Sequence, residues 1–175
     1  YADPAYHAQL ARLDMVVLGG AGHLGTMNEF AEAIKAINPK VTLGKYYNIT
    51  EVFISPAGYY GPQRDKLSSE QGPNGSNARD WWLRDSSGNN IEIWPGTYRT
   101  NITEYVVPDK NGDRWPEWQA KYDYDTWFHS DAWDFWYADE VSWKPKFRSQ
   151  GIIGDYSGGS VTNSSQIHAA YRRGH

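Results

Sequence analysis

The segment over residues 13–48 constrains the fold of this chain most, because it reads as a strand, a helix and a second strand. Residues 13–20 (LDMVVLGG) form a short apolar run that ends in glycines, which is typical of a buried parallel strand. Apolar residues recur at helical spacing over 27–37, and Asn38-Pro39 ends that pattern. Residues 41–48 (VTLGKYYN) then predict a second strand. Such strand–helix–strand connections are right-handed crossovers between parallel strands.

The rest of the chain continues this alternation around one long interruption. Further helices are expected over 6–13, 115–128 and 163–173, and a third strand over 133–141 (WDFWYADEV). The interruption, over about 50–113, is rich in Gly, Pro, Asn and Ser, and it contains two apolar islands joined by a predicted hairpin turn at 85–90. Ordinary connections have about 4–6 residues. We therefore expect a folded insertion that carries a short hairpin.

The predicted fold class is α/β, built from successive strand–helix units. A doubly wound sheet also fits this order, but no Gly-rich phosphate turn follows any predicted strand. A complete (β/α)₈ barrel needs roughly 200 residues or more, and this chain has 175. We predict a partial (β/α)₈ TIM barrel, roughly helix one to helix four, as one domain over 1–175. Because the chain starts at Tyr1, we expect a processed or longer parent, with the barrel completed by its remainder or by other copies of the chain.

Composition and charge exclude several classes of partner and site. The chain has no cysteine, so it has no disulfide, thiolate nucleophile or thiolate metal site. Its formal charge is -4 and it has no Lys/Arg stripe, which disfavours nucleic acid as a partner. No apolar run approaches the roughly 18 residues of a membrane span. Residues 109–113 (DKNGD) resemble a calcium loop without its distal Glu, so we expect a turn there and neither a metal nor a cofactor.

Two acids at the end of the third predicted strand, Asp139 and Glu140, are the candidate catalytic residues. Active sites of α/β barrels lie at the carboxyl ends of the strands. Because side chains alternate along a strand, Asp139 shares a face with Phe135 and Tyr137, whereas Glu140 lies on the other face. Glycoside hydrolysis uses two carboxyl groups about 5–9.5 Å apart, so the partner acid must come from another strand. Asp139 is the favoured member, and the other reading is that either acid only caps the next turn.

Aromatic residues make up 15% of the chain and supply the candidate substrate-binding residues. Trp and Tyr suit sugars, because their rings stack on C–H faces and their polar atoms bind hydroxyl groups. The other reading of the same composition is an aromatic core. The candidates are Tyr46, Tyr47 and Asn48 at the end of the second predicted strand, Trp81 and Trp82 in the insertion, and Trp136 in the third predicted strand. The strand face that carries Trp136 is expected to pack against helices.

The order of five segments resembles a known group of families. The segments are YYNITEV at 46–52, DWWLRDSSGNNIEIWPG at 80–96, WPEW at 115–118, WDFWYADEV at 133–141 and IHAAYRRG at 167–174. They resemble the hypothetical glycosyl-hydrolase-like families of TIM-barrel type related to the endo-α-1,4-polygalactosaminidase group. The resemblance numbers the three predicted strands two, three and four, so that the insertion follows strand three, and it implies an acid at the end of strand four, a position that Asp139 matches.

The resemblance implies a secreted glycoside hydrolase that acts on a polysaccharide or oligosaccharide through a carboxylate pair. One departure concerns strand four, where the families often have Asp-Gly but this chain has Asp134 followed by Phe135, which makes the lumen more crowded. The other function left open by the residues is a non-catalytic carbohydrate-binding or structural assembly protein of the same fold.

Overall fold

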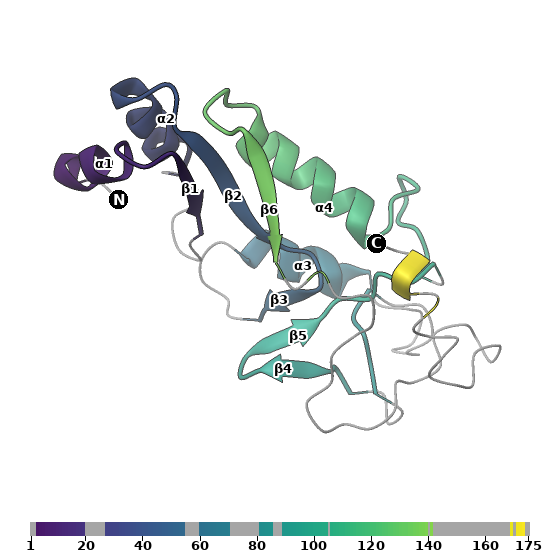
Figure 1. Cartoon of the computed structure of the whole chain (residues 1–175). Helices are drawn as coiled ribbons and strands as arrows, with labels where there is room; N and C mark the ends of the chain where they lie inside the picture. Colours follow the sequence, from purple (N-terminus) through teal and green to yellow (C-terminus); the bar gives the residue numbers. More distant parts are fainter. Residues whose placement is uncertain are drawn as a thin grey trace. The chain divides into compact units, whose positions relative to one another are not determined.

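The computed structural model describes residues 3–19, 27–54, 60–70, 81–85, 89–104, 106–139, 141, 169 and 171–173. It has a mixed α/β fold with a three-stranded parallel sheet and a three-stranded antiparallel sheet (Figure 1). The described residues form two compact units, where the sequence analysis expects one domain with an insertion. Unit 1 holds the described residues of 3–47 and 120–139, and unit 2 holds those of 48–54, 60–119 and 141–173.

The parallel sheet of unit 1 has the strand order β1-β2-β6. Strands β1 and β2 pair in parallel, in a register that runs from Met15 opposite Thr42 to Leu18 opposite Lys45. The strands and helices of this part of the chain are α1 (Pro4–Leu10), β1 (Met15–Leu18), α2 (Met27–Ile37), β2 (Thr42–Asn48), α4 (Trp115–Asp123), the π-helical turn η2 (Tyr124–Phe128) and β6 (Phe135–Asp139). The first residues of α4 and the last residue of β2 belong to unit 2.

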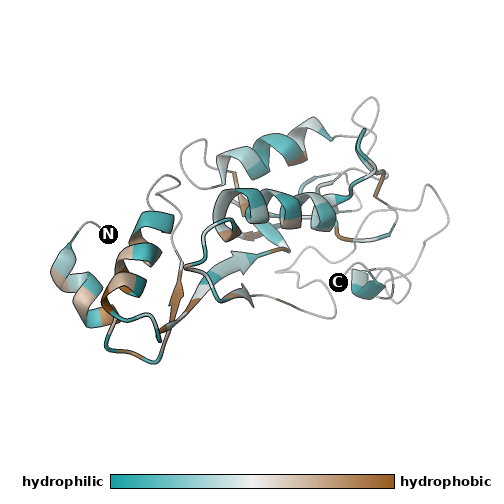
Figure 2. Cartoon of the chain, turned by 90° about the horizontal axis from the view of Figure 1, so that it is seen from above, coloured by the Kyte–Doolittle hydropathy of each residue, from teal (hydrophilic) through white to brown (hydrophobic). Residues whose placement is uncertain are grey.

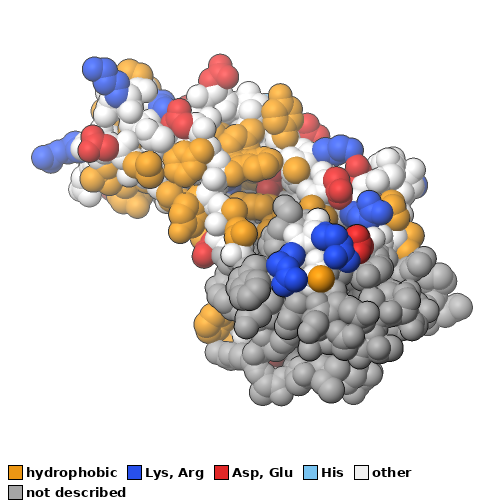
Figure 3. Space-filling model, turned by 45° about the vertical axis from the view of Figure 1, so that its right-hand side comes forward, with side chains coloured by type: hydrophobic (Ala, Val, Ile, Leu, Met, Phe, Trp, Pro, Cys, Tyr) orange, Lys and Arg blue, Asp and Glu red, His pale blue; other side chains and the backbone are white. Residues whose placement is uncertain are grey.

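One face of the parallel sheet is buried and the other is partly open. On β1, Val16 and Leu18 are buried, whereas Met15 and Val17 are 59% and 38% exposed. The β1 strand is hydrophobic throughout (Figure 2), so burial here follows the alternation of side chains and not their hydropathy. Among the described residues, hydrophobic side chains also gather on the surface drawn in Figure 3.

The start of β6 is tied to β2 by Asp134. The Asp134 N–H donates to the carbonyl of Leu43 over 2.9 Å, and the Leu43 N–H donates to Asp134 Oδ2 over 2.7 Å. Lys35 Nζ, from α2, donates to the same oxygen over 2.7 Å. Burial alone would raise the pKa of Asp134, but the bonds from Lys35 and Leu43 outweigh it and hold that pKa below its usual value.

Phe135 follows Asp134 and fills the space above Gly44. A Cβ at Gly44 would lie 2.4 Å from the Phe135 ring, so any other residue at this position of β2 would force that ring to move. The crowding expected from Phe135 therefore has its counterpart in the neighbouring strand. This contact also fixes which face of β6 carries Phe135 and, by alternation, Tyr137 and Asp139.

Unit 2 packs a short antiparallel sheet around an aromatic core. Its elements include β3 (Glu51–Phe53), α3 (Gly61–Ser69), β4 (Glu92–Trp94) and β5 (Thr97–Arg99), with the strand order β3-β5-β4. Pro95 and Gly96 connect β4 to β5, and Gly96 has φ = 79°, as the third residue of a type II turn requires. The buried core contains Val52, Leu67, Trp81, Trp82, Ile102, Val106, Trp115 and Tyr171.

Several predicted elements are confirmed and others were missed. The helix over 27–37 has the predicted bounds, and the strands predicted within 13–20, 41–48 and 133–141 are present. The predicted hairpin is also present: the Asp85 N–H donates to the carbonyl of Asn89 over 2.9 Å, and Arg84 bridges Asn90. The sequence analysis missed α3, β3 and the hairpin of β4 and β5. Of the helix predicted over 163–173, residues 169 and 171–173 are described and are helical.

Candidate functional site

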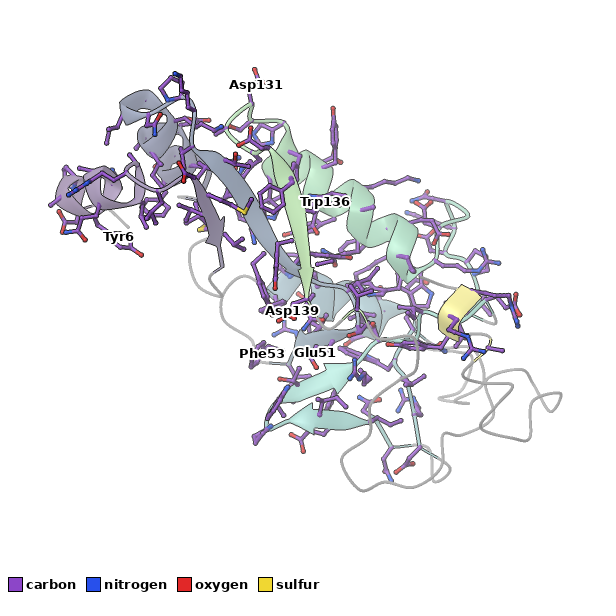
Figure 4. All side chains as sticks on the ribbon, viewed as in Figure 1. Tyr6, Glu51, Phe53, Asp131, Trp136 and Asp139 are labelled. Atoms are coloured by element: carbon purple, nitrogen blue, oxygen red, sulfur yellow. The ribbon has the colours of Figure 1, made fainter. Side chains whose placement is uncertain are left out.

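The carboxyl ends of β2 and β6 bring a phenol and a carboxylate together. Tyr46 lies near the end of β2, and Asp139 is the last residue of the neighbouring strand β6 (Figure 4). The Tyr46 hydroxyl donates to Asp139 Oδ2 over 2.7 Å. Both side chains are half-buried. The carboxylate is therefore held in one orientation while part of it faces solvent.

Tyr137 completes this group of side chains, which we call the Asp139 site (Tyr46, Tyr137 and Asp139). Its ring stacks on that of Tyr46, with centroids 6.1 Å apart and planes at 26°, and it is 45% exposed. Gly19, just after β1, lies against Tyr46, because a Cβ there would be 3.3 Å from Tyr46 Cβ. Sequence analysis did not include Tyr137 among the binding residues, although alternation places it on the face of Asp139.

Tyr47 and Trp136 lie on the face of the sheet opposite Asp139, which corrects the expected place of Tyr47 and agrees with the alternation expected for Trp136. Tyr47 is 8% exposed and stacks on Trp136, with centroids 6.0 Å apart. Trp136 in turn meets the edge of Phe128 from η2 at 5.0 Å, although it stays 42% exposed. Burial, with a smaller effect of Asp123, raises the pKa of Tyr47 well above its usual value. The reason for the separation is the alternation of side chains along β2 and β6.

A buried lysine shares this covered face. Lys45 is 2% exposed, and its Nζ donates to the backbone carbonyl of Tyr46 over 2.8 Å. The same nitrogen lies 5.2 Å from the centre of the Trp127 ring. Burial lowers the pKa of Lys45 to about 8, and the attraction of Asp123 opposes part of that shift. Sequence analysis did not include Lys45 among the site residues, although a lysine inside the apolar run VTLGKYYN was a visible signal.

Asn48 belongs to unit 2, where it organises the turn between β2 and β3. Its Nδ2 donates to Glu51 Oε1 over 2.8 Å, and its Oδ1 accepts the N–H of Thr50 over 3.1 Å. The side chain is 9% exposed. Both ends of the Asn48 amide are thus engaged within the turn.

Trp81 and Trp82 belong to the core of unit 2, which corrects their expected place on a binding surface. They are 0% and 2% exposed. The Trp81 Nε1–H donates to the carbonyl of Val107 over 2.9 Å, and its ring meets that of Trp115 edge-on at 6.3 Å. Trp82 packs edge-on against Tyr98 at 5.8 Å. Neither ring has a free face on which a sugar could stack.

Two further predictions involve acidic residues. Glu140, the second candidate catalytic residue, lies outside the described residues. The turn predicted at 109–113 is confirmed, because Asp109 Oδ1 accepts the N–H groups of Asn111 and Asp113 over 2.8 and 3.0 Å, while Lys66 Nζ donates to its Oδ2 over 2.7 Å. Burial alone would raise the pKa of Asp109, but these bonds hold it below its usual value. In the part of the chain that the structure describes, no three His, Asp or Glu side chains gather in a way that could hold a metal ion.

No family model matches the chain, and no curated protein matches it. Within the described ranges, no helix has the length and hydropathy needed to cross a membrane. The chemistry of the Asp139 site therefore has to be read from its own groups. They are a fixed, partly accessible carboxylate, a hydroxyl donor and an exposed aromatic ring.

Proposed function

We propose that this chain is a glycoside hydrolase, or the part of one that carries the site, and that it acts on a polysaccharide or oligosaccharide. Asp139 supplies one of the two carboxyl groups that such a reaction uses. The observation that carries the proposal is the hydrogen bond from Tyr46 to Asp139 beside the exposed ring of Tyr137. Because enzymes of this class that degrade polymers act outside the cell, secretion is part of the same proposal.

Each group of the Asp139 site has a distinct task in this proposal. The Tyr137 ring offers the flat apolar surface on which the C–H face of a sugar stacks. The Tyr46 hydroxyl holds the Asp139 carboxylate in one rotamer, so that little reorganisation is needed when the sugar arrives. Asp139 then either donates a proton to the glycosidic oxygen as the bond from the anomeric carbon to that oxygen breaks, or attacks the anomeric carbon while a second carboxyl group protonates the leaving oxygen.

The fold that we propose for this enzyme is a partial (β/α)₈ barrel. Its parallel sheet is covered on the face of Val16, Leu18 and Lys45, whereas Met15 and Val17 on the other face are exposed. Parallel sheets usually have both faces covered. In a barrel the open face would line the lumen, and the carboxyl ends of the strands, where Asp139 lies, would carry the active site.

The second candidate function is carbohydrate binding without catalysis. It is favoured by the same exposed Tyr137 ring, because an aromatic platform beside a fixed carboxylate binds a sugar whether or not a second carboxyl group is present. The two candidates differ in what Asp139 does once the sugar is bound.

Asp139→Asn in the full chain separates the two functions. A set of soluble polysaccharides is screened for release of reducing ends, and the substrates that the wild type cleaves are used for the variant. We expect at least about a 100-fold loss of rate, because the amide neither transfers a proton nor attacks carbon, with glycan binding kept. Asp131→Asn is the matched control, since Asp131 is exposed and lies beyond the other end of β6 (Figure 4).

Three results would change the assignment. Unchanged hydrolysis in Asp139→Asn would remove Asp139 from the reaction. No hydrolysis by the wild type, together with glycan binding that Tyr137→Ala abolishes, would support the binding protein instead. Neither hydrolysis nor glycan binding by the wild type would reject both candidates.

A further inference from the structure

The buried lysine on β2 is out of keeping with the face that it occupies. Lys45 lies between Leu43 and Tyr47 on the covered side of the sheet, and all three side chains are buried. An apolar side chain of the same length would fill this place without the cost of removing an ammonium group from water, which is several kcal/mol even after relaxation. Stability alone therefore does not account for a lysine at this position.

One contact of Lys45 is with Tyr46, a residue of the Asp139 site. Its Nζ donates to the backbone carbonyl of Tyr46 over 2.8 Å. Among the described residues, the Trp127 ring of η2 lies 5.2 Å from the amine, and the buried carboxylate of Asp123 at the end of α4 favours its charge. The amine is thus held from the helical side while it binds the peptide of Tyr46.

Tyr46 lies just past the end of the pairing between β1 and β2. The last register pair is Leu18 opposite Lys45, so Tyr46 is the first residue of β2 that this pairing does not include. Its ring rests over Gly19 and against Tyr137, and its hydroxyl reaches Asp139. The Lys45 amine therefore binds the backbone at the residue whose side chain orients the carboxylate.

We propose that Lys45 is a positioning residue for the Asp139 site: its amine fixes the peptide of Tyr46, and the Tyr46 hydroxyl in turn orients Asp139. The catalytic consequence rests on the proposed function, but the structural link does not. The two can be tested separately, because the hydrogen bond between Tyr46 and Asp139 has a signal of its own.

The structural link is tested by nuclear magnetic resonance of protein labelled with ¹³C at tyrosine Cζ. This carbon reports the hydrogen bond of the phenol; Tyr46→Phe assigns the Tyr46 signal, and Asp139→Ala gives its position without the carboxylate acceptor. We expect Lys45→Met to move the signal toward the Asp139→Ala position. Lys121→Met, which removes an exposed lysine of α4, is the matched control and should leave it unmoved. A signal at the wild-type position in folded Lys45→Met overturns the proposal.

Chemical rescue provides a second test, because the chain contains no cysteine. In Lys45→Cys, the only thiolate is alkylated while the protein is unfolded: with 2-bromoethylamine it displaces bromide and forms a thioether that ends in an amine. Alkylation with 1-bromopropane gives a side chain of the same length that ends in a methyl group and has no donor. After refolding, the amine form should restore the wild-type Tyr46 signal and the propyl form should not. Equal signals from the two forms overturn the proposal even if Lys45→Met does not fold.

Kinetics test the catalytic consequence on a polysaccharide that the wild type cleaves. Misplacing a catalytic group lowers the rate of the bound complex more than it weakens binding, so we expect Lys45→Met to lower kcat by about tenfold with KM changed by less than about twofold. The aminoethylated cysteine should recover kcat. An unchanged kcat in Lys45→Met, with the Tyr46 signal moved, would reject the catalytic role of Lys45 while leaving the glycoside hydrolase intact. A wild type without hydrolysis would reject the proposed function, and the resonance tests would still decide the link.

Discussion

Aromatic side chains serve different purposes in the core of unit 2 and in the Asp139 site of unit 1. In unit 2, Trp81, Trp82 and Trp115 are at most 2% exposed and form the core. In unit 1, the Tyr137 ring is 45% exposed and stacks on a half-buried Tyr46 beside a carboxylate. Residues of one chemical class therefore provide stability in one region and an accessible surface in the other. An aromatic-rich composition predicts neither role by itself.

The difference follows from what else each unit can bury. The strands of unit 2 are three residues long, so large rings contribute much of its buried apolar area. In unit 1, aliphatic side chains such as Val16, Leu18 and Leu43 share the buried region with rings such as Tyr47 and Trp127. Tyr46 and Tyr137 lie on the other face of its sheet.

The largest effect on stability is expected from a substitution in the core of unit 2. Trp81→Ala should lower the free energy of unfolding by about 3–5 kcal/mol, because it removes a fully buried ring and leaves a cavity. Urea unfolding followed by far-ultraviolet circular dichroism measures this change. Trp94→Ala, at a ring of the same unit that is 50% exposed, should change it by less than about 0.5 kcal/mol. Equal losses of unfolding free energy in the two variants would contradict the distinction between the buried ring and the exposed one.

Lys45→Met should raise the free energy of unfolding, which sharpens the contrast between stability and function within unit 1. The folded pKa of Lys45 is about 8 against an ordinary value of 10.5, so below pH 8 the fold carries a buried charge at a cost on the order of 3 kcal/mol. As pH rises from about 8 to 10.5, Lys45 loses its proton in the folded protein before it does so in the unfolded chain, so the destabilisation of the wild type disappears. The gain in the variant should therefore be largest below pH 8 and shrink above it. Urea unfolding at pH 7 and pH 10 measures both values, and a gain that does not depend on pH would contradict the explanation.

Asp134→Asn tests a charged group that supports the sheet at the end remote from Asp139. Because the folded pKa of Asp134 is lowered, its charge stabilises the protein above the ordinary pKa of 3.8, and this contribution is lost as pH falls through the lower folded value. The side chain is 39% exposed, so screening reduces the expected loss at pH 7 to about 1 kcal/mol. Thermal unfolding measures the stability of both proteins at pH 7 and at pH 3, and the difference in stability between Asp134→Asn and the wild type should be smaller at pH 3. Asp131→Asn, at an exposed acid, is the control.

The smallest expected effect on stability tests the open side of the comparison. Tyr137→Ala should change the free energy of unfolding by less than about 0.5 kcal/mol, because its ring is exposed. If the ring is a sugar platform, the same variant should lose glycan binding, measured by affinity electrophoresis in polysaccharide gels. A loss of more than about 2 kcal/mol of stability would instead place Tyr137 among core residues such as Trp81.

Sequence patterns predicted elements with strong periodicity and missed short or polar ones. The helix α2 was predicted to its ends, because its apolar face is continuous and Asn38-Pro39 terminates it. The helix α3 was missed, because GPQRDKLSS has hardly any apolar periodicity and is held in place by Leu67 in the core. Strands of three residues, such as β3 and β5, are too short for alternation to be recognised.

The same limits apply to the Asp139 site. Alternation was sufficient to place Asp139 and Tyr137 on one face of β6, but it gave no way to choose between the adjacent Tyr46 and Tyr47. Trp81 and Trp82 were indistinguishable from surface platforms, since burial depends on residues distant in sequence, such as Trp115 and Val107.

The order of residues by itself determined the strand–helix–strand alternation, the parallel pairing of β1 and β2, and the acid at the end of β6. These properties follow from local spacing and from the handedness of crossovers, which need no knowledge of distant contacts. Only the tertiary structure decided which sheet face the helices cover, and hence that Tyr46 meets Asp139 while Tyr47 and Lys45 lie on the covered face. That choice depends on packing among segments as far apart as β2 and β6, which no local pattern encodes.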